Sequence, residues 1–154
     1  MNHIQDDPSL ASEVKWTLLP DFSNAFNSVD CGWIFEEVRN RVPSLSAWFE
    51  SCYGAQPHLL LGKHIIHSCC GVQQGDPLGP LGFALALQPV LEWIRREVPG
   101  LLLNAWYLDD GTLCRAADDL RSALAINEED GPPRGLFLNR QKSLLFVPGD
   151  VPFL

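Results

Sequence analysis

Two adjacent carboxylates, Asp109 and Asp110, are the side chains of this sequence with the clearest chemical potential. Apolar segments at 101–107 and 112–115 bracket them and a glycine follows, which predicts a β-hairpin with both carboxylates at its tip. Adjacent carboxylates repel each other, and no basic residue is closer in sequence than Arg115, so the pair costs energy unless cations neutralise it. A divalent metal site is the economical explanation, although Asp-Asp-Gly is also a common turn sequence.

A third carboxylate, Asp21, ends a short apolar segment at 13–21 that we predict to be a strand. A strand end and a neighbouring hairpin tip lie about 5–10 Å apart in an antiparallel sheet, so Asp21 could join the other two carboxylates. Magnesium suits such oxygen ligands and takes few of them from the protein. Two ions about 3.5–4 Å apart would stabilise the attacking and leaving oxygens of phosphoryl transfer. The alternative for Asp21 is a simple cap of a turn or helix.

Proline and glycine residues divide the chain into short periodic segments, which set the predicted fold. We predict helices at 34–41, 44–53, 81–94 and 116–127, hairpin strands at 59–61 and 63–68, and one or two closing strands within 136–147. The loop at 71–80 is rich in Gly and Pro, the loop at 128–134 is acidic, and Pro89 should interrupt or kink its helix. The resulting order, β-αα-ββ-α-ββ-α-β, predicts an α+β fold in which helices pack on one face of an antiparallel sheet.

The composition indicates one folded domain over residues 1–154. Hydrophobic residues make up 46% and charged residues 19%, which excludes a disordered, collagen-like or coiled-coil chain. No apolar run reaches the ~18–20 residues of a membrane span, and the first residues lack the basic start and apolar stretch of a signal peptide. We therefore expect an intracellular protein of the cytoplasm or nucleus, not secreted and without a membrane partner.

The cysteines form no regular framework, and we expect them to be reduced, buried thiols. There are five: Cys31, Cys52, Cys69, Cys70 and Cys114. Two of them closely follow His64 and His67, which raises a zinc site as an alternative. The spacing matches no standard set of zinc ligands, and the segment alternates like a strand.

Four segments of the chain form an ordered set of short motifs. Residues 21–30 read Asp-Phe-Ser-Asn-Ala-Phe-Asn-Ser-Val-Asp, residues 71–80 read Gly-Val-Gln-Gln-Gly-Asp-Pro-Leu-Gly-Pro, and residues 106–111 read Trp-Tyr-Leu-Asp-Asp-Gly. With residues 135–142, which begin Gly-Leu-Phe-Leu-Asn, they resemble motifs A, B, C and D of reverse transcriptases, most fully those of non-long-terminal-repeat retroelements. The resemblance implies the palm of an RNA-directed DNA polymerase, an α+β domain with a ferredoxin-like or RRM-like core.

The resemblance places the family's metal ligands on Asp21, Asp109 and Asp110, which implies two bound Mg²⁺ or Mn²⁺ ions. Such ions would lower the pKa of the primer 3′-hydroxyl, bridge the triphosphate of the incoming nucleotide and neutralise charge on the leaving pyrophosphate. Phe22 matches a position whose main-chain carbonyl is a metal ligand in the family. Lys142 matches a lysine thought to donate a proton near the leaving phosphates, although a lone lysine beside a strand is usually solvated.

The resemblance also implies a nucleotide-binding set. Phe26 matches an aromatic that lies under the sugar and excludes a 2′-hydroxyl, with a core phenylalanine on a short helix as the alternative. Gln74 and Gly75 match residues that lie against the nascent base pair, where glycine allows close main-chain approach. Tyr107 would support the primer end, with core packing as the alternative, and strand alternation puts Trp106 on the opposite side of the sheet.

Other features depart from the family pattern. Only 20 residues precede Asp21 and 12 follow Lys142, so the fingers and thumb of a working reverse transcriptase do not fit in this sequence. Cys31 stands where the family often has arginine. The chain has three lysines and a net charge of −8, the wrong sign for holding nucleic acid by overall attraction, so the chain alone should bind a template weakly.

Two hypotheses follow for the function. In the first, the chain is the palm of a polymerase, a fragment not active alone, which binds an RNA/DNA template-primer and a deoxynucleoside triphosphate in its full-length context. In the second, it is a degenerate or domesticated retroelement remnant that acts as a non-catalytic binding or structural module. In either case, exposed palm surface favours self-association.

Overall fold

The computed structural model of the chain describes residues 15–55, 58–73 and 75–147, and its elements follow the predicted order with one short helix added. The elements are β1 (Trp16–Leu19), α1 (Ala25–Ser28), α2 (Cys31–Arg41), α3 (Ser46–Tyr53), β2 (His58–Leu61), β3 (His64–His67), α4 (Leu78–Glu97), β4 (Leu103–Tyr107), β5 (Asp110–Arg115), α5 (Ala117–Asp130) and β6 (Leu144–Phe146). Short 3-10 turns at Pro43–Leu45 and Pro132–Arg134 precede α3 and follow α5. The added helix is α1.

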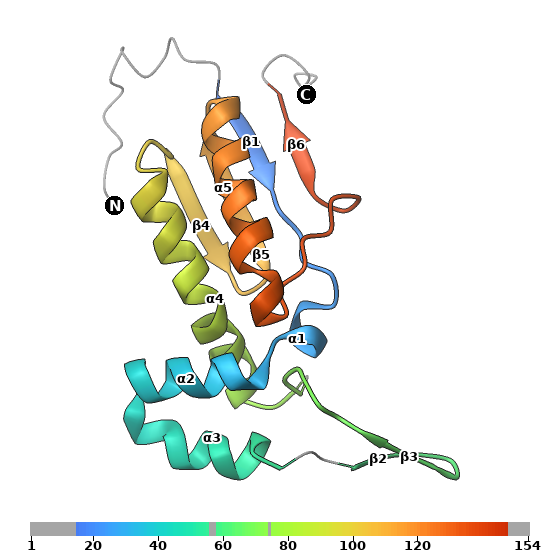
Figure 1. Ribbon diagram of the computed structural model, residues 1–154. Coiled ribbons are helices and arrows are strands. Elements are labelled where there is room, and N and C mark those ends of the chain that lie inside the picture. The colour runs from blue at the N-terminus through green and yellow to red at the C-terminus, as the bar shows by residue number, and fades with distance from the viewer. Residues whose placement is uncertain (1–14, 56–57, 74, 148–154) are drawn as a thin grey trace.

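The main sheet has four strands in the order β4-β5-β1-β6, and every neighbouring pair is antiparallel. The long helix α4 and the helix α5 lie over one face of this sheet (Figure 1). Leu18 of β1 and Leu113 of β5 are buried beneath them, together with Val90 of α4 and Ala123 of α5. The prediction of an α+β fold with helices on one face of an antiparallel sheet is therefore confirmed.

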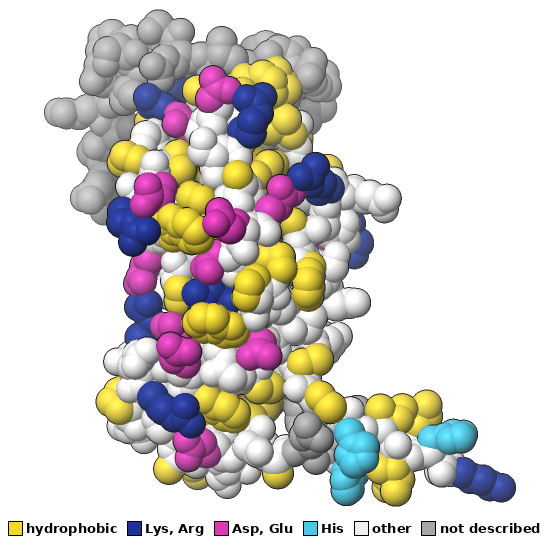
Figure 2. Space-filling model, viewed as in Figure 1, with side chains coloured by type: hydrophobic (Ala, Val, Ile, Leu, Met, Phe, Trp, Pro, Cys, Tyr) yellow, Lys and Arg dark blue, Asp and Glu magenta, His cyan; other side chains and the backbone are white. Residues whose placement is uncertain are grey.

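The hairpin of β2 and β3 projects away from this body (Figure 1). The two strands pack chiefly against each other, and Leu60 is 78% exposed and Ile65 60% exposed. Figure 2 shows histidines and a basic side chain gathered along the hairpin, with apolar side chains between them. The segment from 58 to 67 contains Lys63 and three histidines but no acidic residue.

Several element boundaries differ from the prediction. The predicted helix at 34–41 begins earlier, at Cys31, because the carboxylate of Asp30 accepts the amide of Trp33 at 3.1 Å and caps the first turn. The helix predicted at 81–94 runs from Leu78 to Glu97 without interruption at Pro89. The apolar face around Val90 stays buried, so packing outweighs the hydrogen bond that proline removes.

The chain beyond 127 was predicted to be an acidic loop, and this is wrong for its first residues. Helix α5 continues to Asp130, whose carboxylate accepts a hydrogen bond from the buried Arg134 at 3.0 Å. The guanidinium of Arg134 also lies 3.9 Å from the centre of the Trp33 ring. These contacts fix the end of α5 against α2. The local composition, from which we predicted a loop, does not indicate them.

The first and last strands are shorter than predicted. β1 covers Trp16–Leu19 of the predicted 13–21, of which residues 13 and 14 lie outside the described residues. In the closing segment, β6 is Leu144–Phe146, and a single bridge joins Leu138 to Phe22. Among the helices of the described residues, none has the length and apolar character needed to cross a membrane.

Candidate functional site

An open cleft of about 330 Å³ at one end of the main sheet brings together three of the predicted site residues. Asp21, Asp110 and Lys142 line it, with Leu19, Pro20, Gly111, Thr112 and Leu144. The sheet register explains the meeting, because β1 and β5 are antiparallel and Leu18 stands opposite Leu113. Continuing this register for three residues brings Asp21 opposite Asp110. Strand pairing thus joins two carboxylates that are far apart in sequence.

Asp21 is held by its main chain and has one unsatisfied side-chain oxygen. Its amide donates to the hydroxyl of Ser143 at 3.0 Å, and its carbonyl accepts the amide of Asn139 at 2.8 Å. The carboxylate oxygen Oδ2 is buried and has no hydrogen-bond partner in the described part of the chain. Burying a carboxylate oxygen without a hydrogen-bond partner costs free energy, so a bound cation would satisfy this oxygen.

Asp109 lies in the two-residue loop of the β4–β5 hairpin. The register of this hairpin ends with Tyr107 opposite Asp110, which leaves Leu108 and Asp109 between the strands. Leu108 adopts a left-handed backbone with φ 56°, a conformation typical of tight hairpins but unfavourable for leucine. Its side chain packs against the core, which offsets part of that cost.

The three carboxylates do not form a ready-made metal cluster. Asp109 is not among the residues that line the cleft. Within the described residues, no group of three or more His, Cys, Asp or Glu side chains is placed to hold one ion. The structure therefore assembles two of the three predicted ligands, Asp21 and Asp110, on one surface. The same finding gives no support to the zinc alternative at His64, His67, Cys69 and Cys70.

Close packing under the cleft explains the glycine that follows the acidic pair. A Cβ atom on Gly111 would lie 2.6 Å from the ring of Trp106 and 2.7 Å from Pro20. Trp106 in turn stacks on the buried Phe22, with ring centres 5.7 Å apart. This aromatic layer supports both strands that carry the carboxylates.

Alternation along β4 separates the two aromatic residues of its end. Trp106 is half-buried, whereas Tyr107 is 78% exposed, so the prediction that they face opposite sides is confirmed. Core packing, the alternative considered for Tyr107, is wrong for this chain because the ring meets solvent. Support of a primer end by Tyr107 stays a prediction.

The segment that resembles motif B lies against the segment that resembles motif A. The amide of Gly71 donates to the carbonyl of Val29 at 2.8 Å, and the amide of Val72 donates to that of Phe26 at 2.6 Å. The ring of Phe26 stacks on Phe83 of α4, with centres 4.8 Å apart. Phe26 therefore contacts the core, as the alternative proposed, and its role as a sugar gate stays a prediction.

The remaining predicted site residues are dispersed. Gly75 has φ +91°, and a Cβ atom there would meet no atom of the described residues within 4 Å. Gln74 lies outside the described residues. The described residues that were predicted to be functional but do not line the cleft are Phe22, Phe26, Gly75, Tyr107 and Asp109.

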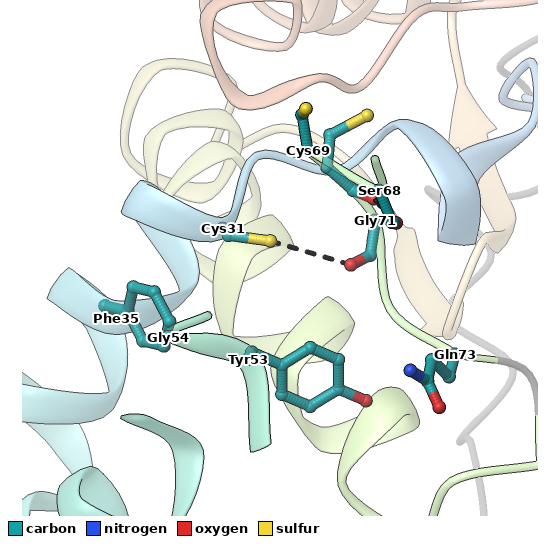
Figure 3. A pocket seen from close by; sticks show the side chains of 9 residues that line it. Cys31, Phe35, Tyr53, Gly54, Ser68, Cys69, Gly71 and Gln73 are labelled. Carbon is teal, nitrogen blue, oxygen red and sulfur yellow. Dashed lines mark hydrogen bonds between the residues drawn. The ribbon is translucent and has the colours of Figure 1, made fainter. Parts of the chain in front are cut away.

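A second pocket, of about 190 Å³, lies between α2, α3 and residues 68–73 (Figure 3). The thiol of Cys31 donates to the carbonyl of Gly71 at 3.6 Å across it. Burial raises the pKa of Cys31, and the neighbouring Asp30 and Cys70 raise it further.

All five cysteines are free thiols, but the expectation that they are buried is wrong. Cys52, Cys69 and Cys70 are exposed, and Cys31 and Cys114 are half-buried. The exposed ones lie at the end of α3 and just after β3, in the part of the chain that packs least on the core. The location of these three cysteines in the chain therefore outweighs the general preference of cysteine for the interior.

Sequence reasoning missed the residues that hold the site from a distance. Ser143 and Asn139 fix the main chain of Asp21 across more than a hundred residues of sequence. Asn139 belongs to the segment that resembles motif D, but no local pattern indicates that either residue contacts Asp21. Tyr53 was read only as the end of a helix, yet its hydroxyl bonds to Asp76 in the loop after residue 71. The other carboxylate oxygen of Asp76 accepts a hydrogen bond from the amide of Leu78 at 3.0 Å, at the start of α4.

The fold and this cleft define a polymerase-type palm, and comparison with known families agrees. The family model described as "Reverse transcriptase (RNA-dependent DNA polymerase)" matches residues 3–154. The chain belongs to the reverse transcriptase family.

Individual relatives are much longer than this chain. A stretch of 91 residues is 32% identical to the retrotransposable element SLACS 132 kDa protein of Trypanosoma brucei gambiense, covering 58% of this chain and 8% of that protein. The fold resembles telomerase from Candida albicans, solved with a fragment of telomeric RNA, at TM-score 0.70 and 12% identity over 94% of this chain and 29% of that one. Telomerase from Candida tropicalis gives TM-score 0.66 and 11% identity over 90% of this chain and 26% of that one.

Proposed function

We propose that this chain is the catalytic palm of an RNA-directed DNA polymerase, which adds deoxynucleotides to a primer 3′-hydroxyl. The observation that carries the proposal is the cleft in which Asp21 of one strand end, Asp110 of another strand and Lys142 of the closing segment meet. Membership of the reverse transcriptase family supports the same reaction class.

Asp21 and Asp110 fit divalent cations of the magnesium type. They offer hard carboxylate oxygens on one cleft, and the buried Oδ2 of Asp21 has no partner among the described residues. Asp109, next to Asp110 in the hairpin loop, is the third proposed ligand. Two Mg²⁺ or Mn²⁺ ions bound there would supply charge stabilisation for phosphoryl transfer.

Lys142 contributes the positive charge of the cleft. Its amide donates to the carbonyl of Asn139 at 3.1 Å, in the same turn whose Ser143 holds Asp21, so the lysine is built on the element that fixes the acid. An exposed ammonium on a short turn can reach phosphate oxygens and donate a proton to a leaving pyrophosphate. We assign Lys142 that role.

The nucleotide would be held by residues outside the cleft lining. Phe26 and Gly75 belong to two segments that are hydrogen-bonded together through Val72. In the proposal, the Phe26 ring limits space at the 2′ position of the sugar, and the main chain of Gly75 approaches the nascent base pair. Gln74 and Tyr107 are assigned to base and primer contacts on the family resemblance.

The template and its duplex require charge that this chain does not supply. With a net charge of −8 it neutralises few phosphates, so template-primer binding in the proposal depends on the longer context that its relatives have. We therefore expect no measurable primer extension on an RNA template by this chain alone.

The test is binding of a deoxynucleoside triphosphate with Mn²⁺, measured by calorimetry on the wild type and on Asp21→Asn. The wild type should bind, and the variant should lose both metal and nucleotide affinity, by more than about 100-fold for the metal. Asp118→Asn, at an exposed acid of α5, makes the same charge change away from the cleft and should leave binding unchanged. Absence of any metal or nucleotide binding by the wild type would instead favour the non-catalytic remnant.

A further inference from the structure

The closing segment reaches Asp21 through the pairing of two strands. β6 pairs antiparallel with β1, and Leu19 stands opposite Leu144 at the end of the pairing. Continuing this register by two residues brings Asp21 opposite Lys142. Pro20, which lies between Leu19 and Asp21, has no amide hydrogen to donate to a neighbouring strand. The main chain of Asp21 is therefore held by other hydrogen bonds than those of the sheet.

The hydroxyl of Ser143 takes the place of a main-chain partner for Asp21. It accepts the amide of Asp21 at 3.0 Å and donates to the carbonyl of Asn139 at 2.9 Å. The amide of Asn139 in turn donates to the carbonyl of Asp21 at 2.8 Å. These hydrogen bonds close a ring of three residues. A hydroxyl that accepts and donates at the same time strengthens both of its bonds by polarisation.

Lys142 is part of the turn that closes this ring. Its amide donates to the main-chain carbonyl of Asn139 at 3.1 Å and lies 3.3 Å from the side-chain oxygen Oδ1 of the same residue. Lys142 also directly precedes Ser143. The turn from Asn139 to Ser143 thus carries the cation of the cleft and fixes one of its acids.

The carboxylate of Asp21 depends on its main chain for its position. Its buried oxygen Oδ2 has no hydrogen-bond partner within the described ranges, so no such bond orients this oxygen. Groups that orient a metal ligand from outside typically change metal affinity by about 10–100-fold when they are removed. A hydroxyl bonded to the amide of Asp21 is such a group.

We propose that Ser143 is a positioning residue for the polymerase reaction: its hydroxyl holds Asp21 and Lys142 in a fixed relation, so that the bound metal and the nucleotide phosphates are engaged together. This inference rests on the proposed function. Ser143 acts through the main chain of Asp21 and through the turn that carries Lys142. Threonine at this position keeps the hydroxyl, whereas valine has the shape of threonine without the hydroxyl, so the two variants separate chemistry from shape.

Hydrogen exchange of backbone amides, followed by NMR, tests the ring directly. Ser143→Val should speed exchange of the Asp21 and Asn139 amides by about 10-fold, because the ring loses its hydroxyl, and Ser143→Thr should stay near the wild type. Ser122→Val removes a hydroxyl that donates to the carbonyl of Asp118 on α5, and it should leave both amides unchanged. Unchanged exchange in Ser143→Val, or equal acceleration in the valine and threonine variants, overturns the proposal.

Metal affinity separates positioning from a merely structural role. In calorimetry, Ser143→Val should weaken Mn²⁺ binding by about 10-fold, whereas Ser143→Thr should stay within about 3-fold of the wild type. Equal weakening in both variants would assign the effect to shape and overturn the role of the hydroxyl. If the wild type binds no Mn²⁺, the polymerase proposal fails, and the exchange experiment still decides whether Ser143 fixes Asp21.

A double-mutant cycle tests the link between Ser143 and Lys142. Lys142→Ala should weaken binding of a deoxynucleoside triphosphate with Mn²⁺ by about 10-fold in the wild-type background but by only about 2-fold in Ser143→Val, because the lysine is then no longer held in place. Lys63→Ala makes the same charge change in the exposed hairpin turn and should leave nucleotide binding unchanged in both backgrounds. Equal factors for Lys142→Ala in the two backgrounds contradict the link.

A smaller substitution covers the case in which Ser143→Val does not fold. Ser143→Ala removes the same hydroxyl without adding methyl groups. It should show the same acceleration of the Asp21 and Asn139 amides and the same weakening of Mn²⁺ binding, each by about 10-fold. Wild-type exchange and wild-type metal affinity in Ser143→Ala overturn the proposal.

Discussion

The cleft and the β2–β3 hairpin are built in opposite ways. Strands of the main sheet frame the cleft, and Gly111 packs against Trp106 and Pro20. The amide of Asp21 donates a hydrogen bond to Ser143 in the closing segment. The hairpin packs chiefly against itself and exposes Leu60 and Ile65. Two-stranded hairpins are only marginally stable without further packing, so the molecule combines a fixed site with a loosely supported arm.

Because of this difference, substitutions in the cleft should report on ligand binding, whereas substitutions in the hairpin should report on association with other molecules. Around Asp21, position is over-determined by sheet register and main-chain hydrogen bonds, so replacing the carboxylate should change binding and not shape. In the hairpin, side chains contact solvent, so the same kind of substitution should change what the chain meets in solution.

The largest effect is expected from removing the hairpin-tip charges. Asp109→Asn combined with Asp110→Asn should abolish binding of Mg²⁺ or Mn²⁺ in calorimetry, because the cleft then keeps one carboxylate. The thermal transition should be retained, since Asp110 is exposed and Asp109 lies in the hairpin loop. Unchanged metal affinity in this double variant would remove the metal hypothesis.

Substitutions at two glycines compare the stability of the cleft with that of the hairpin. Gly111→Ala places a methyl group against Trp106 and Pro20 and should lower the free energy of unfolding by roughly 1–3 kcal/mol in urea titrations. Gly62→Ala, in the hairpin turn at φ +61°, places its methyl group more than 4 Å from every atom of the described residues outside the turn. It should change the global free energy of unfolding by less than about 0.5 kcal/mol, since the hairpin can open locally. Equal losses in both variants would show that the hairpin belongs to the cooperative core.

Alkaline stability should report on the buried Tyr53 hydroxyl and its hydrogen bond to Asp76. The pKa of Tyr53 is raised from 10.0 to about 12 in the folded chain, first by burial and then by the bond to Asp76. The unfolded chain ionises this phenol at lower pH, so its stabilising effect is complete below about pH 10 and is lost as pH rises toward about 12. The free energy of unfolding should therefore fall over this range in the wild type, with a shallower fall in Tyr53→Phe.

The smallest effect on stability is expected in the arm itself. Leu60→Ser with Ile65→Ser should change the free energy of unfolding by less than about 0.5 kcal/mol, because both side chains are mostly exposed. The same change should reduce self-association in size-exclusion chromatography. Trp48→Ser, at a 63% exposed residue of α3, is the matched control outside the hairpin. A wild-type chain that elutes as a clean monomer at high concentration contradicts the expectation of self-association.

The order of elements was predictable because most of them have strong local signals. An apolar run of helical length marked α4, Gly62 marked the hairpin turn, and the acidic pair between two apolar runs marked the β4–β5 tip. The same local signals placed Trp106 and Tyr107 on opposite sides of the sheet. Membership of the family followed from four motifs in sequence order, which the family match over residues 3–154 confirms.

The rest depended on contacts between distant segments. Nothing near Ser143 indicates that it bonds to Asp21, and nothing near Tyr53 indicates that its hydroxyl meets Asp76. The exposure of Cys69 and Cys70 follows from the projection of the hairpin, which composition does not encode. The sequence predicted that Asp21 could meet the acids of the hairpin tip, but the register of β1 on β5, which brings Asp21 opposite Asp110, was not predictable from local patterns.

The antiparallel pairing of β1 with β5 also determines which changes of chain length the site tolerates. The residues between them, including the projecting arm, can be shortened or extended without altering which acids face each other across the two strands. Deletion of one residue inside β5 is different, because it turns every following side chain to the other surface of the sheet and moves Leu113 out of the interior. Insertions should therefore be tolerated in the β2–β3 hairpin but not within the strands of the main sheet.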